Sequence, residues 1–582
     1  GPDAHPPHAP PPSPSGPDAP APPPARGPGH PSLGRAIQTV SGLTLVSRVL
    51  GLLRDVLTAA LFGTTAVGSA FAAAFAIPNT FRRLFGEGAL SAAFLPEYAR
   101  LDRDDPRRAA ALASLTLAGL ALVAGLVTLL AEAALLALLL TTPHDAERAL
   151  SLRLIMLMLP FMPLISLAAI LGGMLQTHGR FGPWAAAPIL LNLFMIAAAL
   201  PFVLGGGAPV PGAYALGVAA VLAAAAQVAW SLLALRRVAA WRWSPGEARD
   251  AGRRVLHRFG PVVLGLGTLQ INSLLDTLVA MWPIWVGSTI DTPAGVLAYP
   301  LDDASNAILF YAQRLYQFPL GVFGVAVATA VFPALSREAD DAPAFGETLR
   351  RGLRLSLFIG LPASLGLALV SRNLVGAIFE GLGERFTAEG ADRTAAVLGF
   401  YAAGVWAYSL NQVLTRAFYA AGDTRTPTRI AVGMVALNAV LNVSLIWWLR
   451  EAGLALATAT SATAQTALLL LCAARLPGGR PLDASVRRGA GKTLGVAAAM
   501  GAAVGAVLLV LPGATSPLGR MGVLAACVGI GAMVYLAAAR LSGAPELRWL
   551  LHRGVAVPPK QPRSPKAPAE PAPGCEENAH DP

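Results

Sequence analysis

Five arginines stand inside long apolar stretches of this 582-residue chain: Arg48, Arg54, Arg82, Arg83 and Arg314. A charged side chain at the centre of a membrane helix costs at least ~2.5–3.5 kcal/mol. A water-filled cavity with a cationic wall removes much of that cost. Because a guanidinium binds phosphate oxygens through two parallel hydrogen bonds, phosphate is its natural ligand. The five residues therefore predict a cavity that binds an anionic, phosphate-bearing ligand.

The spacing leaves other interpretations open for some of these arginines. Arg48 and Arg54 lie about 120° apart on a straight helix. Both reach one cavity only if the groove is wide or the helix bends, as it could at Gly51. Arg54 could instead form a local ion pair with Asp55, and one arginine could extend to the membrane surface.

Other polar side chains accompany the arginines in the apolar stretches. Hydrogen bonding between helices explains such groups at least as well as ligand contact does, so both interpretations stay open for the amides. The supporting polar residues are Asp55, Glu87 on the same helix face as Arg83, Gln270, Asn272, Asp276, Gln313 and Gln317.

Motifs for catalysis, metal binding and nucleotide binding are absent from the sequence. The three cysteines form no CxxC pair. The segment Gly491-Lys492-Thr493 has Val486 where a phosphate-binding loop needs glycine. We therefore expect no enzyme activity, no metal site and no cofactor. A coupling cation or the membrane potential remains as a source of energy.

The elements that must position these residues are membrane helices. Hydrophobic residues make up 54% of the chain and charged residues 13%, against about 25% charged in soluble domains. With that apolar content, the net charge of +11 fits anionic lipid headgroups rather than nucleic acid. The apolar runs predict an all-α polytopic membrane protein with fourteen transmembrane helices, at 35–62, 66–98, 109–140, 149–176, 184–204, 212–235, 255–281, 304–333, 349–370, 393–421, 427–449, 452–474, 490–512 and 519–541.

Arginine is concentrated in alternate loops, after the second, sixth, eighth and twelfth runs. Since cytoplasmic loops carry the excess of Lys and Arg, both termini are predicted to be cytoplasmic. The loop 371–392 is a mild exception, with two arginines beside three glutamates.

The pattern divides the chain into five parts. Proline-rich tails at 1–33 and 544–582 are expected to be disordered. Between them we predict an N-terminal lobe at 34–240, a C-terminal lobe at 241–478 and two extra helices at 479–543. Segment 53–59 aligns with 274–280, and 93–100 with 330–337. Two lobes repeated in the same direction are typical of transporters, although alanine-rich helices can also match by chance.

Several segments resemble motifs of the MurJ/MviN family, the lipid II flippases. They are 47–55 (SRVLGLLRD), 77–85 (IPNTFRRLF), 93–96 (AFLP), 311–319 (YAQRLYQFP) and 418–427 (FYAAGDTRTP), and the resemblance runs from about 35 to 541. It implies the fold of the multidrug/oligosaccharidyl-lipid/polysaccharide exporter superfamily in the bacterial cytoplasmic (inner) membrane.

The resemblance also implies a function in peptidoglycan biosynthesis. The family moves the undecaprenyl-pyrophosphate-linked precursor from the inner to the outer leaflet by alternating access. It implies that the arginines Arg48, Arg54, Arg82, Arg83 and Arg314 hold the pyrophosphate, and that the two extra helices receive the lipid tail. The partners would be lipid II and membrane lipids. The sequence does not indicate an oligomeric state.

This chain departs from the family pattern at Ser69, Gln313 and Gln317, where some members carry acids. Any coupling role of those acids is therefore in doubt here. The alternatives are an exporter of another polyprenyl-linked saccharide or of a drug, a membrane enzyme acting on polyprenyl phosphates, and a membrane scaffold. Five arginines argue against a drug site, and the sequence lacks the carboxylate cluster that such an enzyme would need.

Overall fold

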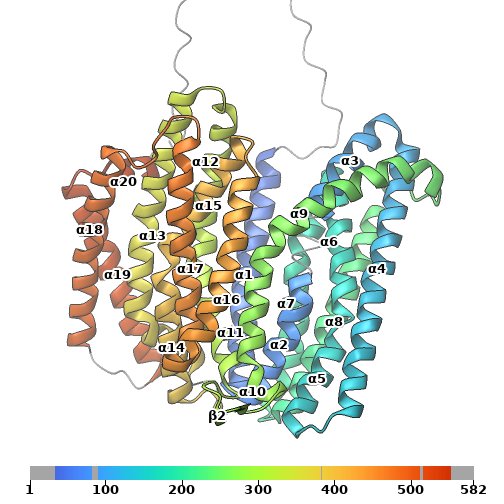
Figure 1. The fold of residues 1–582 in the computed structure, drawn as a ribbon, viewed down its shortest axis with the longest axis horizontal. Coiled ribbons are helices and arrows are strands. Elements are labelled where there is room, and N and C mark those ends of the chain that lie inside the picture. The colour runs from blue at the N-terminus through green and yellow to red at the C-terminus, as the bar shows by residue number, and fades with distance from the viewer. Residues whose placement is uncertain (1–32, 82–89, 382, 512–515, 552–582) are drawn as a thin grey trace, which may run out of the picture.

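The apolar runs fold into α-helices that lie side by side, with one short β-hairpin (Figure 1). The structure is a computed structural model that describes residues 33–81, 90–381, 383–511 and 516–551. Arg82, Arg83 and Glu87, three of the predicted site residues, lie outside these ranges.

The first group of helices forms the N-terminal lobe, which we define as α1–α8. Its helices are α1 (Leu33–Phe62), α2 (Ala66–Phe81), α3 (Leu90–Asp104), α4 (Pro106–Thr141), α5 (Ala146–Met158), α6 (Phe161–Thr177), α7 (Phe181–Leu204) and α8 (Pro209–Leu235).

Helix α9 (Pro245–Ala280) leads to the C-terminal lobe, which we define as α10–α17. The lobe comprises α10 (Trp282–Trp285), β1 (Thr289–Thr292), β2 (Gly295–Ala298), α11 (Ser305–Pro319), the π-helical turn η2 (Leu320–Gly324), α12 (Val325–Arg337), α13 (Ala342–Phe379), α14 (Ala388–Ala403), α15 (Val405–Ala420), α16 (Arg425–Leu449), α17 (Glu451–Cys472) and the 3₁₀ turn η3 (Ala473–Arg475). The helices α18 (Ala484–Val510), α19 (Pro517–Leu541) and α20 (Pro545–Leu551) follow.

The prediction of an all-helical polytopic membrane protein is confirmed. Within the described ranges, nine helical segments are long and apolar enough to cross a membrane. Within the described ranges, the residues of each predicted span fall mainly on one helix or on consecutive helices, such as α5 and α6. The count of fourteen stays a prediction, because several of these helices are short.

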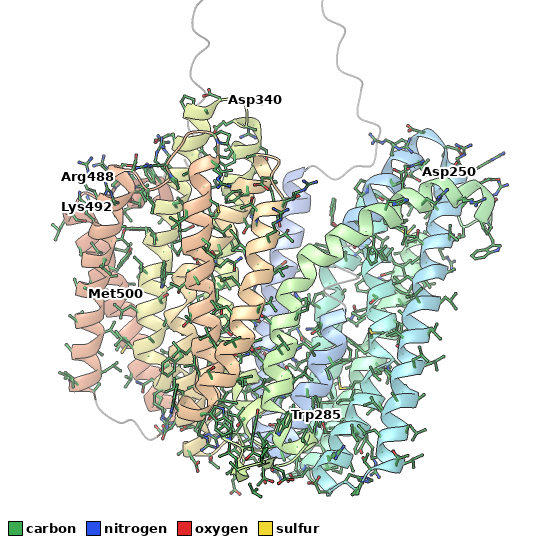
Figure 2. The ribbon with its side chains drawn as sticks, in the orientation of Figure 1. Asp250, Trp285, Asp340, Arg488, Lys492 and Met500 are labelled. Carbon is green, nitrogen blue, oxygen red and sulfur yellow. The ribbon has the colours of Figure 1, made fainter. Side chains whose placement is uncertain are left out.

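The two ends of the helix bundle differ in chemistry. One, the arginine-rich end, carries the connections and adjoining helix ends at 99–108, 236–258, 337–354 and 475–492, with Asp250, Asp340 and Arg488 (Figure 2). The other, the hairpin end, carries α10, the β-hairpin and the loops at 142–145 and 380–387, with Trp285 (Figure 2). The β-hairpin pairs Thr289 with Ala298.

Local sequence explains how helices begin at these ends. Asp105 accepts a hydrogen bond from the backbone N–H of Arg108, and Pro106 stands at the first position of α4. Asp145 and Asp483 cap α5 and α18 in the same way. Aspartate caps satisfy backbone donors that have no partner within the helix, so each polar loop ends where the next span starts.

Helix α9 belongs to both lobes, which differs from the boundary expected at 240/241. Its first part packs on the N-terminal lobe, where Ala251 and Val255 share a buried cluster with Phe94 and Leu112. Its last part packs against α16. The boundary defined by packing therefore lies within α9, since one continuous helix crosses from one lobe to the other (Figure 1).

The stretch after 543, expected to be a disordered tail, begins with the docked helix α20. Glu546 of α20 is 2% exposed and accepts a hydrogen bond from Arg354 of α13 at 2.7 Å. The guanidinium of Arg354 also lies 5.1 Å from the ring centroid of Trp549. One buried acid and one aromatic ring therefore hold this segment on the bundle.

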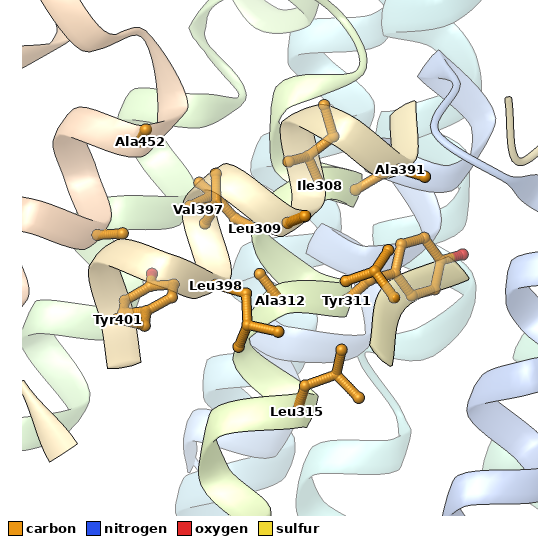
Figure 3. Close-up of a cluster of buried hydrophobic side chains, with 14 of the residues drawn as sticks. Ile308, Leu309, Tyr311, Ala312, Leu315, Ala391, Val397, Leu398, Tyr401 and Ala452 are labelled. Carbon is orange, nitrogen blue, oxygen red and sulfur yellow. The ribbon is translucent and has the colours of Figure 1, made fainter. Parts of the chain in front are cut away.

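One buried cluster of the C-terminal lobe lies near its hairpin end. Ile308, Tyr311 and Leu315 of α11 share one buried cluster with Leu398 and Tyr401 of α14 (Figure 3). Both of these tyrosines are at most 2% exposed. This packing fixes α11, the helix that carries Arg314, against the rest of its lobe.

Candidate functional site

A cavity of about 410 Å³ lies among α1, α2, α6, α7, α8 and α11. It contains Arg48 and Arg54 from α1 and Arg314 from α11. The structure therefore places three of the five predicted arginines around one space. The other lining side chains are apolar or uncharged: among the described residues, none that lines this cavity is acidic.

Arg54 is held by two partners. Its Nε and Nη2 donate to Oδ1 of Asp55 at 3.1 and 2.7 Å, and its Nη1 donates to Oδ1 of Asn192 at 2.9 Å. Asn192 in turn donates from Nδ2 to the backbone oxygen of Ser47. The ring of Phe75 lies 5.4 Å from the guanidinium. The local pair with Asp55 that the sequence left open is formed, yet Arg54 still lines the cavity.

Arg314 reaches the same carboxylate from the other lobe. Its Nε lies 4.0 Å from Oδ2 of Asp55. Its guanidinium stacks over Phe310 at 4.6 Å. Asp55, which is 5% exposed, thus faces one guanidinium from each lobe. Because a buried charge is costly without an opposite partner, this carboxylate acts as the internal counter-ion of the cavity.

Arg48 extends from α1 toward the break between α11 and α12. Its guanidinium lies 5.9 Å from the ring centroid of Phe318. A β-carbon added at Gly321, in the π-helical turn, would lie 3.0 Å from Nη2 of Arg48. A side chain there would press on the guanidinium, so the turn and its glycine leave space for Arg48 between the lobes.

The three arginines lie far from the ends of their helices at the hairpin end. At ~1.5 Å per residue, Arg54 lies ~12 Å and Arg48 ~21 Å from the hairpin end of α1, and Arg314 lies ~14 Å from the start of α11. With those helix ends placed at the surface of a hydrocarbon core of ~30 Å, the three groups would lie near its middle.

Most of the supporting polar residues lie elsewhere. Asp276 of α9 accepts a hydrogen bond from Asn442 of α16 at 2.7 Å, beside Asn438 and Thr458. Gln313 donates to the hydroxyl of Tyr401. Gln270, Asn272 and Gln317 are half-buried, and among the members of the set that the structure describes, only Arg48, Arg54 and Arg314 line the 410 Å³ cavity.

Sequence reasoning missed Asn192, the residue that orients Arg54. A signal was present, because Asn192 is the only side chain with an amide, hydroxyl or charge in the apolar run 184–204. Its partners lie 138 and 145 positions away, so spacing alone did not connect them.

Contacts between the lobes close the hairpin end of the cavity. Ser69 of α2 accepts hydrogen bonds from two α11 groups, the N–H of Ala307 at 3.0 Å and the side chain of Asn306 at 2.9 Å. Trp285 of α10 donates to the hydroxyl of Ser151 at 2.9 Å. Ser69, noted only for replacing an acid, is therefore a contact residue between the lobes.

An ion-pair network stiffens the same end of the C-terminal lobe. Arg393 donates to Asp302 at 2.9 Å and to Glu451 at 2.7 Å, while Arg450 donates to Asp302 at 2.6 Å. Burial would raise the pKa of the Asp302 carboxyl, but the two guanidiniums hold that pKa below its ordinary value. The network ties the start of α11 to α14 and to the turn between α16 and α17.

These features define a two-lobed helical membrane transporter with a cationic cavity between its lobes. The family described as "Lipid II flippase MurJ" matches residues 58–520, and the chain belongs to this family. Membership makes it a transporter rather than an enzyme, in the bacterial inner membrane, as the sequence predicted.

Two relatives illustrate the similarity to this family. A "Probable lipid II flippase MurJ" of Vibrio cholerae is 33% identical over 451 residues, covering 74% of this chain and 81% of the relative. One of Thermotoga maritima is 29% identical over 523 residues, covering 88% and 97%.

A solved structure described as "Lipid II flippase MurJ, inward closed conformation" has a TM-score of 0.68 at 22% identity, covering 88% of this chain and 98% of that one. An inward-facing multidrug resistance transporter of the MATE family has a TM-score of 0.59 at 13% identity, covering 75% and 97%. At these identities the two structures show the shared fold.

Proposed function

We propose that this protein moves lipid II, the undecaprenyl-pyrophosphate-linked peptidoglycan precursor, from the inner to the outer leaflet. The observation that carries the proposal is the cavity near the middle of the bilayer, where Arg48, Arg54 and Arg314 converge from two lobes. Pyrophosphate is the part of this lipid that most needs protection from the hydrocarbon core. Arginine side chains are best suited to supply this protection, because a guanidinium binds phosphate oxygens through two parallel hydrogen bonds.

The arginine-rich end faces the cytoplasm in this proposal, with both termini, because cytoplasmic loops carry the excess of arginine. The hairpin end then faces outward. Since Ser69, Asn306 and Ala307 join the lobes at the hairpin end, the described conformation is closed to the outside. A headgroup would enter from the cytoplasmic side.

Asp55 suggests how binding and movement are linked. In the structure it faces both Arg54 and Arg314. A pyrophosphate would compete with Asp55 for these guanidiniums and would contact one arginine from each lobe at the same time. An anion that binds two arrangements of the lobes with different affinity shifts the balance between them, which is the requirement for alternating access.

The membrane potential can contribute to the transfer. An anionic headgroup that moves from a negative interior to the outside gains about 2.3 kcal/mol per charge per 100 mV. Within the proposal, no resident cofactor is needed, and the lipid tail stays in the bilayer beside the lobes.

The test measures the leaflet accessibility of lipid II in proteoliposomes, with and without a membrane potential. Arg48→Ala and Arg314→Ala should each slow transfer at least ~tenfold, since a hydrogen bond to a charged group is worth about 1.5–3 kcal/mol. Arg314→Lys keeps the charge without the bidentate geometry and should retain part of the rate.

Arg337→Ala is the matched control, because Arg337 is an exposed arginine at the end of α12 in the same lobe. Its rate should equal that of the unmodified protein. Full transfer by both Arg48→Ala and Arg314→Ala would exclude the proposed pyrophosphate site.

A further inference from the structure

A second cavity, of about 520 Å³, lies toward the hairpin end and is separate from the arginine cavity. Helices α4 and α5 of the N-terminal lobe form one wall. Leu274, near the end of α9, and Trp285 of α10 contribute from the other side. Its volume is within the ~300–1,000 Å³ of ordinary small-molecule sites. We refer to it as the interlobe cleft.

The interlobe cleft opens along the exposed apolar face of α4, a helix long and apolar enough to cross a membrane. Helix α4 supplies five of its lining residues, Val127, Ala131, Ala134, Leu135 and Leu138. Val127 is 41% exposed and Leu138 36% exposed, in a helix whose outer face is otherwise leucine-rich. An apolar opening on a membrane-spanning helix meets acyl chains, so a hydrocarbon chain is the natural occupant.

The length of the cleft matches one leaflet. From Val127 to Leu138 the helix rises ~17 Å, at ~1.5 Å per residue. Half of a ~30 Å hydrocarbon core is ~15 Å. A single chain of one lipid, lying along α4 in the leaflet at the hairpin end, therefore spans the cleft.

One charged side chain lines this apolar space. Arg148 stands in the first turn of α5, and its Nε is buried without a hydrogen-bond partner among the described atoms. Its Nη1 makes one long hydrogen bond, 3.4 Å, to the backbone oxygen of Pro143. A buried donor without an acceptor is costly, and a lipid phosphate at the mouth of the cleft would satisfy it.

We propose that the interlobe cleft binds one acyl chain of an anionic phospholipid, with the headgroup phosphate on Arg148. The walls come from both lobes, which Trp285 and Ser151 join by a 2.9 Å hydrogen bond beside the cleft. Separation of the lobes at the hairpin end would take Trp285 and Leu274 away from α4 and α5. The lipid therefore binds the described conformation selectively and stabilises it.

Tryptophan quenching tests the position of the chain. The protein is placed in nanodiscs of phosphatidylcholine that contain phosphatidylglycerol with brominated acyl chains. The brominated chains should quench the fluorescence of Trp285, and this component of the quenching should be absent from the variant Trp285→Phe. Because Trp285→Phe also removes the bond to Ser151, a second pair of variants keeps Trp285 in place.

Ala131→Phe fills the interlobe cleft and should remove that component. Ala133→Phe adds the same ring to the same helix at a residue that does not line the cleft, and should leave the component unchanged. Equal quenching in the two alanine variants would overturn the site.

Headgroup selectivity tests the role of Arg148. Brominated phosphatidylglycerol should quench Trp285 several-fold more than brominated phosphatidylcholine at equal content. Arg148→Gln should abolish this preference, whereas Arg153→Gln, an exposed arginine on the same helix, should keep it. A preference that survives Arg148→Gln, or that both variants lose, would overturn the proposal. Quenching reports lipid occupancy and not transfer, so this test is independent of the proposed flippase function.

Discussion

At the scale of single residues, the arginine cavity depends on one carboxylate. Arg54 and Arg314 come from different lobes, and Asp55 faces both. Buried guanidiniums without an anion would be costly, so Asp55 allows the cavity to exist before a ligand arrives. The pair with Asp55 does not compete with a role for Arg54 in binding. It makes that role possible.

Asn192 gives the first prediction at this scale. Asn192→Leu should slow lipid II transfer roughly tenfold or more, because Arg54 loses an acceptor and its fixed orientation. Asn192→Asp keeps an acceptor for Arg54 while losing the donor to Ser47, and should retain most of the rate. The leaflet accessibility assay measures both. If Asn192→Leu and Asn192→Asp slow transfer equally, the hydrogen bond to Arg54 does not explain the effect of Asn192.

At the scale of elements, long helices tie separate parts of the molecule together. Helix α9 starts on the N-terminal lobe and ends on α16. Helix α13 receives α20 at its arginine-rich end through Arg354 and Glu546. Helix α9 therefore joins the two lobes as one continuous helix.

Helix α20 gives the second prediction. Glu546→Ala should lower the free energy of unfolding by about 1–3 kcal/mol, because Arg354 loses its buried partner. Trypsin should then cleave faster after Arg548. Thermal unfolding in detergent and timed proteolysis measure the two effects.

The control for α20 is Glu347→Ala, which removes an acid that also pairs with arginines of α13 but is half-exposed. It should cost less than ~1 kcal/mol. If both variants behave alike, burial of Glu546 does not explain the docking of α20.

At the scale of the whole molecule, close backbone contacts hold the lobes together at the hairpin end. A β-carbon at Gly383 would overlap the backbone oxygen of Ala60 in α1, and one at Gly390 would overlap the hydroxyl of Thr64. Glycines here allow the loop after α13 and the start of α14 to touch the N-terminal lobe. The closed hairpin end thus requires residues without a β-carbon at positions 383 and 390.

This closure gives the third prediction. Gly383→Ala should push the lobes apart at the hairpin end and shift the protein toward an outward-open state. Ala307→Cys, at a site that is fully buried here, then reports the shift in a background without the native cysteines. Labelling by a membrane-impermeant maleimide should rise several-fold.

Gly399→Ala is the matched control, since nothing lies within 4 Å of a β-carbon built there. It should leave the labelling of Ala307→Cys at its original rate. If labelling of Ala307→Cys does not rise in Gly383→Ala, the contact between Gly383 and Ala60 does not limit opening at the hairpin end.

The sequence by itself determined the class of protein, the helical spans and the scarcity of charge within them. These depend on the cost of placing each residue in hydrocarbon, which is local and nearly additive along the chain. The motifs at 47–55 and 311–319 also indicate the family from the sequence, without knowledge of the fold.

Only the tertiary structure decided which polar groups meet. It joined Arg54 to Asn192, which is 138 positions away, and brought Arg314 to Asp55, while it placed Asp276 beside Asn442 of α16. It also placed part of α9 on the N-terminal lobe. Such contacts depend on how distant helices pack, and helix spacing constrains only the face of one helix, not the helix that it meets.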